Sequence, residues 1–355
     1  MSRMRAIKTW HLFWRIARPQ RRSPFRWVSR PVSVGERTVP VAGVVLRVRE
    51  YRPHTPSATI VLNGGFVPES VDDPRLMNFA TALAEIGFSV LTPDYPAVRA
   101  LDFDPETIDQ IRGVIEYARR RSSRPEAEAV IVLGLSYMGT LSLKAALSPE
   151  LAQPPEFVGV FGGYADFGDL MREVFSDVYR ADGCAVPVDP YGRFLVLRSA
   201  LAYFDAPESE RDRIRAILLA IGRQGDSAEI DRAVQALSPA GRACVETLRR
   251  FHPERSPRQW HAIVSGSRAL IEALSVTESA DRLRSRLLIL HSVHDHILPC
   301  SGSIALHRRF PSADMVLTTL FTHVDVRLSP RTLWAHAREL RALSRLFGEM
   351  VALQR

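Results

Sequence analysis

Cysteine is scarce in this chain of 355 residues. The three cysteines, Cys184, Cys244 and Cys300, are widely spaced and odd in number, and no C-x-x-C string is present. This usage argues against a disulfide framework and fits a reducing compartment. We therefore expect a cytoplasmic protein.

Long apolar runs are lacking as well. No stretch of eighteen or more apolar residues appears, which argues against a transmembrane span. The hydrophobic content of 46% and the charged content of 24% are those of a soluble globular protein. A chain of this length has room for one large α/β domain with an insertion, or for two small domains.

Acidic side chains are absent from residues 1–30, which hold nine basic ones. The net charge of +8 belongs to this segment, because 38 basic residues stand against 39 acidic ones in the rest of the chain. The body is therefore close to neutral and gives no indication of a nucleic-acid partner.

Residues 4–18 have the periodicity of a helix with an apolar face and a basic face, and Pro19 ends the pattern. The apolar side chains recur at three- and four-residue spacing: Met4, Ile7, Trp10, Trp14 and Ala17. Residues 1–30 thus form a basic amphipathic segment, and its pattern leaves two roles open. It makes peripheral contact with a membrane, or its aromatic side chains dock on the body of the protein or on a second subunit.

The stretch that carries chemistry lies at residues 129–146. The apolar run Ala129–Leu133 leads into the string G-L-S-Y-M-G at 134–139, and a helix-favouring segment follows. A buried strand, a tight turn with one serine and then a helix is the context of a nucleophile elbow. The alternative is an ordinary serine at a helix N-cap. Ser136 is the candidate nucleophile, and the backbone N–H of Tyr137 is placed to face an oxyanion.

This string resembles the G-x-S-x-G elbow of the α/β-hydrolase superfamily, with Met138 at the position of the second glycine. The resemblance covers about residues 32–166 and 284–353. In that family, a His-Gly string after an early strand supplies a second oxyanion N–H. Here the string is Asn-Gly-Gly-Phe at 63–66, so the resemblance implies the backbone of Gly65 or Phe66 as the donor.

The resemblance also implies an acid and a base. The family carries a His-Gly-x-x-Asp-x-x-Val-Pro string whose aspartate orients the catalytic histidine, and Asp295 falls on that position with Ser292 in place of the glycine. His323, which follows the last predicted strand, falls where the general base of the family lies. The chain order Ser136, Asp295, His323 is that of α/β-hydrolases.

A metal site is the competing interpretation of the residues around Asp295. His291, His294 and His296 flank this aspartate, and histidines with a carboxylate can ligate zinc. Their spacing does not match the usual metallohydrolase strings, and no second cluster appears in the sequence. We therefore expect neither a metal nor a cofactor.

Apolar runs and helical patterns alternate from residue 58 to residue 161, which predicts a mostly parallel central sheet flanked by helices. Residues 32–34 and 41–51 predict a hairpin before it. Between residues 167 and 283 the strand signal vanishes, and helical patterns predict a cap over the carboxyl ends of the strands. The expected division is an N-terminal segment at 1–30, an α/β-hydrolase core at 31–166 and 284–355, and a helical cap at 167–283.

Aromatic side chains recur in the predicted cap, where they either line an acyl pocket or pack the core of the cap itself. They are Phe175, Tyr179, Phe194, Tyr203 and Phe204.

A serine nucleophile with an acid and a base predicts acyl transfer on a small-molecule substrate. The favoured reaction is hydrolysis of a carboxylic ester, a thioester or an amide through an acyl-enzyme on Ser136. An acyltransferase using the same three residues is one alternative. A non-catalytic binding protein is the other, because Asn63, Met138 and Ser292 depart from the family pattern.

Overall fold

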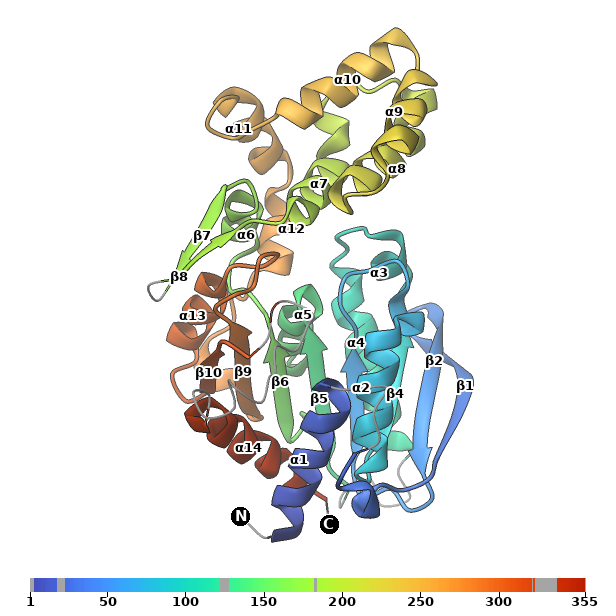
Figure 1. Ribbon diagram of the computed structural model, residues 1–355, viewed down its shortest axis with the longest axis vertical. Coiled ribbons are helices and arrows are strands. Elements are labelled where there is room, and N and C mark those ends of the chain that lie inside the picture. The colour runs from blue at the N-terminus through green and yellow to red at the C-terminus, as the bar shows by residue number, and fades with distance from the viewer. Residues whose placement is uncertain are drawn as a thin grey trace.

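The computed structural model describes residues 3–17, 23–121, 128–181, 184–320, 322 and 337–354. A central sheet with helices on both faces forms the lower part of the molecule, and a group of helices lies above one end of this sheet (Figure 1).

The central sheet has eight strands in the order β1-β2-β4-β3-β5-β6-β9-β10. The pairs β1–β2 and β2–β4 are antiparallel, and every other pair is parallel. The predicted mostly parallel sheet is therefore confirmed. The strands are β1 (Val32–Val41), β2 (Val44–Pro53), β3 (Thr59–Asn63), β4 (Ser89–Asp94), β5 (Val130–Leu135), β6 (Phe157–Phe161), β9 (Arg286–Ser292) and β10 (Asp314–Thr318).

The two faces of the sheet are buried by different helices. Ile131 and Leu133 of β5 belong to a core that includes Leu12 of α1 and Leu343 of α14, whereas Val132 belongs to a core shared with α4 and α5. This alternation is what a strand covered on both faces requires. The helices around the sheet are α1 (Arg3–Ala17), α2 (Pro74–Glu85), α3 (Pro96–Ala100), α4 (Glu106–Arg120), α5 (Tyr137–Ala146), α13 (Cys300–Arg309) and α14 (Ala337–Ala352).

The first hairpin is longer than predicted. Strand β1 continues through residues 35–40, which the sequence pattern left out, and the turn is made by Ala42 and Gly43 at φ 44° and 77°. Positive φ at both central residues is typical of tight hairpin turns. The prediction failed because residues 33–38 are exposed, so this edge strand has no alternation of apolar and polar side chains.

The part above the sheet contains helices and one hairpin. The helices are α6 (Phe167–Glu173), α7 (Pro190–Ser199), α8 (Arg211–Gly222), α9 (Ser227–Gln235), α10 (Pro239–Arg250), α11 (Pro257–Gly266) and α12 (Arg268–Leu274). Strands β7 (Val178–Ala181) and β8 (Cys184–Pro187) pair antiparallel. The expectation that no strand occurs here was wrong, since four-residue strands are too short to show a period of two. We call residues 167–283 the cap.

The aromatic side chains of the cap mostly pack against each other. The ring of Phe251 lies 5.6 Å from that of Phe175 and 5.4 Å from that of Phe204, both in edge-on contact. Phe194 is buried in the same core. Phe175, Phe194 and Phe204 therefore pack the core of the cap, as one of the two alternatives predicted. The hydroxyl of Tyr179 instead donates to the carbonyl oxygen of Ile297, outside the cap.

Helix α1 lies against the body of the protein, beside α14 and α2 (Figure 1). Leu12 and Phe13 are buried, and the ring of Phe13 lies edge-on to that of Phe347 at 5.3 Å. Met4 and Trp10 stay exposed, at 50% and 37%. Helix α1 thus docks on the body, as one alternative predicted, but through Leu12, Phe13 and His11 rather than through the predicted apolar face. Membrane contact stays a prediction. Within the described ranges, no helix combines the length and the apolar character needed to cross a bilayer.

Candidate active site

Ser136 lies in a sharp turn between β5 and α5. Its backbone has φ 58° and ψ −135°, a conformation that is strained for any residue other than glycine. Its N–H donates to the carbonyl oxygen of Phe161 at 2.7 Å, and its own carbonyl accepts from the N–H of Gly139 at 2.8 Å. The strand, turn and helix predicted for the elbow are therefore present.

The glycines of the elbow are required by close packing. A Cβ atom on Gly134 would lie 2.5 Å from the carbonyl oxygen of Met138, and one on Gly139 would lie 3.0 Å from a methyl group of Val160 on β6. Met138 itself is fully buried in the core of the protein. The residue that lets α5 approach the neighbouring strand is thus Gly139, which explains how the chain tolerates methionine at position 138.

Asn63, at the position of the family's histidine, supports the elbow from within. Its side chain is fully buried, accepts a hydrogen bond from the hydroxyl of Tyr95 at 2.8 Å and donates to Ser142 Oγ at 2.8 Å. Ser142 in turn donates to the carbonyl oxygen of Met138 at 2.6 Å. This chain of bonds joins the end of β3 to the first turn of α5.

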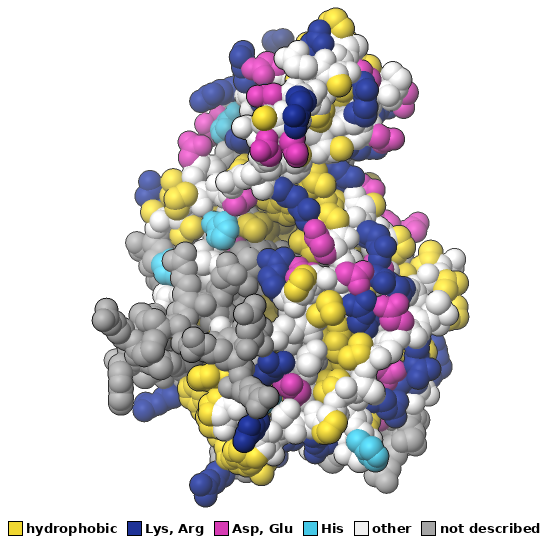
Figure 2. All heavy atoms as spheres, turned by 45° about the vertical axis from the view of Figure 1, so that its right-hand side comes forward, with side chains coloured by type: hydrophobic (Ala, Val, Ile, Leu, Met, Phe, Trp, Pro, Cys, Tyr) yellow, Lys and Arg dark blue, Asp and Glu magenta, His cyan; other side chains and the backbone are white. Residues whose placement is uncertain are grey.

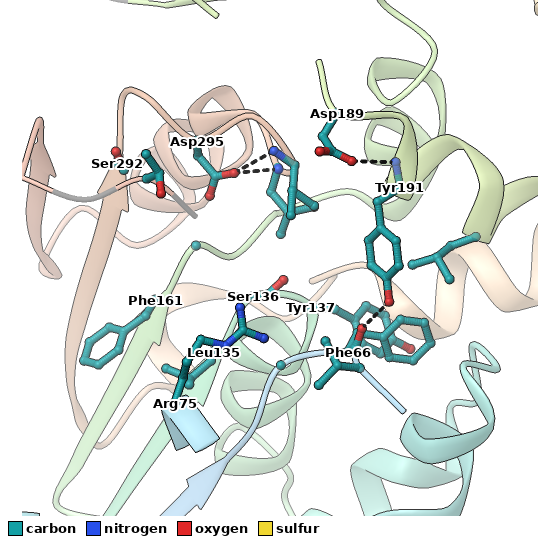
Figure 3. A pocket seen from close by; sticks show the side chains of 18 of the residues that line it. Phe66, Arg75, Leu135, Ser136, Tyr137, Phe161, Asp189, Tyr191, Ser292 and Asp295 are labelled. Atoms are coloured by element: carbon teal, nitrogen blue, oxygen red, sulfur yellow. Dashed lines mark hydrogen bonds between the residues drawn. The ribbon is translucent and has the colours of Figure 1, made fainter. Parts of the chain in front are cut away.

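Asp295 is held by the loop that follows β9. Its Oδ1 atom accepts hydrogen bonds from the backbone N–H groups of Ile297 and Leu298, both at 2.9 Å (Figure 3). Its side chain is buried, with 4% exposed. These two bonds fix the orientation of the carboxylate and therefore also the direction in which its other oxygen, Oδ2, points.

Gly162 lies beside both the carboxylate of Asp295 and the elbow. It has φ +76°, and a Cβ atom built on it would lie 3.8 Å from Asp295 Oδ2 and 3.9 Å from the Cα atom of Ser136. Its N–H donates to the carbonyl oxygen of Leu290 at 2.8 Å, which joins β6 to β9 at this point. The structure thus brings Ser136 and Asp295 close to the same side of one glycine.

The remaining predicted residues are placed as follows. His323 lies outside the described residues. His291 is buried, with Nδ1 2.7 Å from Ser303 Oγ and Nε2 3.2 Å from the carbonyl oxygen of Leu298. Among the residues that the structure describes, no three histidine, cysteine or acidic side chains are arranged to hold a metal ion.

The loop after β3 contains the predicted oxyanion donors. In the part of the chain that is described, the N–H groups of Gly65 and Phe66 have no acceptor. Tyr137 is the first residue of α5, a position whose N–H has no acceptor within a helix. All three residues line the same cavity as Ser136. The site therefore offers three backbone donors near the elbow.

This cavity has a volume of about 630 Å³ and lies between the core and the cap. Hydrophobic side chains are visible in the hollow beneath the cap helices (Figure 2). Stacked and tilted aromatic rings form one wall, with Phe66 5.0 Å from Phe103 and 4.8 Å from Tyr137. The cap contributes side chains from α6 and α7: Leu170, Met171, Tyr191, Leu195 and Val196.

Among the described residues, two arginines line the cavity, and each is paired with a carboxylate. Arg75 binds Asp73 with its guanidinium group, at 2.5 Å for the shortest contact. Arg223 of the cap binds Glu69 of the core at 2.8 Å. These two positive charges are therefore compensated, and the Arg223–Glu69 pair also joins the cap to the core.

The sequence alone did not single out Gly162, Arg75, Arg223 or Tyr191. The pair of glycines after β6 was the one available signal for Gly162. The contact of Tyr191 with Phe66 spans 125 positions of the chain, and no local pattern predicts such a contact.

The chain matches no family model and no curated protein. It does resemble solved structures. The 2,6-dihydroxy-pseudo-oxynicotine hydrolase is 14% identical, with 90% of this chain and 68% of that chain covered and a TM-score of 0.46. An esterase of Pyrococcus furiosus is 11% identical, with 91% of each chain covered and a TM-score of 0.48. Brefeldin A esterase, a bacterial homologue of human hormone sensitive lipase, is 14% identical, with 99% of this chain and 86% of that chain covered and a TM-score of 0.45.

The fold is that of the α/β-hydrolases. Its basis in this chain is the mostly parallel eight-stranded sheet with helices on both faces and the elbow that carries Ser136 at the end of β5. The fold implied by the sequence resemblance is thereby confirmed.

Proposed function

We propose that this protein is a serine hydrolase that cleaves a carboxylic ester, a thioester or an amide through an acyl-enzyme on Ser136. The observation that carries the proposal is the strained backbone of Ser136, at φ 58°, in the wall of a cavity that Asp295 also lines. Glycine would adopt this conformation without strain. A serine held there at a cost in stability is typical of a residue with a chemical role.

In the proposed reaction, His323 removes the proton of Ser136 Oγ as this oxygen attacks the carbonyl carbon of the substrate. Asp295 orients the histidine and stabilises its charged form. The N–H of Tyr137, together with that of Gly65 or Phe66, stabilises the oxyanion of the tetrahedral intermediate. The leaving group takes the proton from the histidine, and a water molecule then releases the acyl group by the same sequence of steps.

The lining of the cavity favours an uncharged substrate with an apolar acyl group. Aromatic and aliphatic side chains form most of the wall next to Ser136, and both arginines are paired with carboxylates. A substrate carboxylate would have to displace Asp73 or Glu69 to bind there, whereas an apolar group gains from burial at about 25 cal/mol per Å².

The proposal is tested with a fluorophosphonate probe and a panel of p-nitrophenyl esters of different chain length. We expect the wild-type protein to be labelled and to hydrolyse the esters, and Ser136→Ala to do neither while keeping its thermal unfolding temperature. An acyltransferase would be labelled but would turn over only with an acceptor alcohol present. Absence of labelling in the folded wild-type protein would instead support the non-catalytic binding protein.

A further inference from the structure

Tyr191 connects the cap to the loop that holds the oxyanion donors. Its hydroxyl donates a hydrogen bond to the carbonyl oxygen of Phe66 at 3.0 Å (Figure 3). Its backbone N–H donates to Asp189, the N-cap of α7, at 2.8 Å, which fixes the turn from which the side chain projects. Burial raises the pKa of Tyr191 to about 12, so the hydroxyl keeps its proton and acts as a donor at neutral pH.

This hydrogen bond acts on two successive peptide groups. The carbonyl of Phe66 belongs to the peptide that ends in the N–H of Val67, and this N–H donates to the carbonyl oxygen of Gly65 at 3.0 Å. The carbonyl of Gly65 belongs in turn to the peptide that ends in the N–H of Phe66. In a planar trans peptide, the C=O and N–H groups point in opposite directions. The direction of the Phe66 N–H is therefore set through these two peptide planes.

The loop needs such a restraint because of its composition. Gly64 and Gly65 precede Phe66, and glycine has the widest range of backbone conformations. A Cβ atom on Gly65 would meet nothing within 4 Å, so packing does not hold the backbone from this side. Stabilisation of an oxyanion depends on donors that already point at the developing charge before reaction.

We propose that Tyr191 is a positioning residue for the oxyanion hole, and that its hydroxyl holds the backbone of residues 65–67 so that the N–H of Phe66 is directed at the oxyanion. The proposal rests on the proposed hydrolysis through Ser136. It assigns the cap a role in the chemical step, in addition to covering the substrate.

The same helix of the cap offers a matched control. Arg198, at the other end of α7, donates to the carbonyl oxygen of Leu101 at 2.6 Å and pairs with Asp102 at 3.2 Å. This contact also joins the cap to the core, but Arg198 does not line the cavity. Arg198→Met weakens the attachment of α7 without touching the loop at residues 65–67. The variant Tyr191→Phe removes one oxygen atom and preserves the ring.

The experiment compares kcat and KM of the wild-type protein, Tyr191→Phe and Arg198→Met on an apolar p-nitrophenyl ester. Loss of an entire oxyanion donor costs about 10²–10³-fold in kcat, so we expect a misdirected donor in Tyr191→Phe to lower kcat by about tenfold, with KM within twofold of wild type. The inhibition constant of a trifluoromethyl ketone, which forms a tetrahedral adduct on serine, should rise by the same factor. The inhibition constant of the product acid should not change. Arg198→Met should keep the wild-type kcat.

Three results would overturn the proposal: an unchanged kcat in Tyr191→Phe, a rise in KM alone, or an equal loss of kcat in Arg198→Met. Thermal unfolding of each variant shows whether a loss of kcat is caused by misfolding. If Tyr191→Phe misfolds, the kinetics of Tyr191→Trp, which keeps a ring N–H but not the position of the hydroxyl, are measured in the same way. If the wild-type protein is inactive and is not labelled by the probe, the proposed function itself is contradicted. An active wild type with an unaffected Tyr191→Phe would remove only the role of Tyr191.

Discussion

The Nε2 atom of His291 lies 3.4 Å from the Oδ2 atom of Asp295, the carboxylate oxygen on the side of Gly162. The same nitrogen lies 3.2 Å from the carbonyl oxygen of Leu298, and the Nδ1 atom lies 2.7 Å from Ser303 Oγ, which itself donates to the carbonyl oxygen of Gly163. His291 thus helps to hold the acid loop, a role that the sequence pattern did not distinguish from metal binding.

We predict that His291→Phe lowers both stability and activity. The ring is replaced at similar volume, but the buried polar contacts of both ring nitrogens are lost, which costs about 1–3 kcal/mol in the free energy of unfolding. A displaced carboxylate at Asp295 should lower kcat/KM by at least about tenfold. Urea unfolding and ester kinetics measure the two effects. The control is Ser303→Ala, which removes the partner of the other ring nitrogen, at 2.7 Å, and should affect stability more than kcat/KM. If the His291→Phe variant is destabilised but keeps the wild-type kcat/KM, the role of His291 is limited to packing.

Ser136→Gly and Ser136→Ala should differ in stability although both abolish activity. Neither variant has a nucleophile, but only glycine adopts φ 58° without strain. Relief of this strain should make the glycine variant more stable than the alanine variant by about 1 kcal/mol, after allowance for the greater entropy of glycine in the unfolded chain. Urea midpoints at pH 7 measure the difference. Equal midpoints would show that Ser136 is not strained.

Two glycines near the site should respond differently to a methyl group. A Cβ atom on Gly134 would lie 2.5 Å from the carbonyl oxygen of Met138 and 2.7 Å from the Cα of Gly139, which are backbone atoms that cannot move aside. Gly134→Ala should therefore lower the free energy of unfolding by about 3 kcal/mol. Gly65→Ala has open space and should unfold at the wild-type temperature, but its methyl group beside the cavity should lower ester turnover. Thermal unfolding of both variants measures this difference in stability. Equal destabilisation of the two would contradict the packing described for the elbow.

The sequence predicted those parts of the fold that are determined locally. The apolar run before Ser136 and the helical pattern after it are buried on all sides, so pattern and structure agree there. Most of the edge strand β1 and the whole hairpin β7–β8 were missed because exposed or very short strands have no distinct period. Within the predicted helical cap, the sequence did not predict the break at Ser267 between α11 and α12.

The candidate site was predictable only where a local string carries it. Ser136 and Asp295 each follow a strand within a recognisable string, and the structure places both beside Gly162. His323 was predicted in the same way and lies outside the described residues. The contact of Tyr191 with Phe66 depends on how distant segments meet, which amino-acid types alone do not encode. The partners of His291 lie in the loop after β9 and in α13, but no recognisable string marks them.

The last prediction concerns pH and the docking of α1. Glu85 accepts a hydrogen bond from His11 at 2.9 Å and one from Arg15 at 2.9 Å, both on α1. Burial raises the pKa of Glu85, but these two partners outweigh it and hold the pKa below its ordinary value. A carboxyl group whose pKa is lowered in the folded state contributes stability above its unfolded pKa of about 4.3, and this contribution is lost as the pH falls through the folded pKa.

We therefore expect Glu85→Gln to be less stable than wild type at pH 7, by about 1–3 kcal/mol for the loss of hydrogen bonds to charged groups. Below about pH 4 the difference should shrink, because the wild-type carboxyl group is then protonated as well. Urea unfolding between pH 3 and 8 measures both curves. Glu116→Gln, on the outer face of α4, removes the same charge from a side chain that is 38% exposed and should follow the wild-type curve. A constant difference between Glu85→Gln and wild type at all pH values would show that the charge of Glu85 does not hold α1 in place.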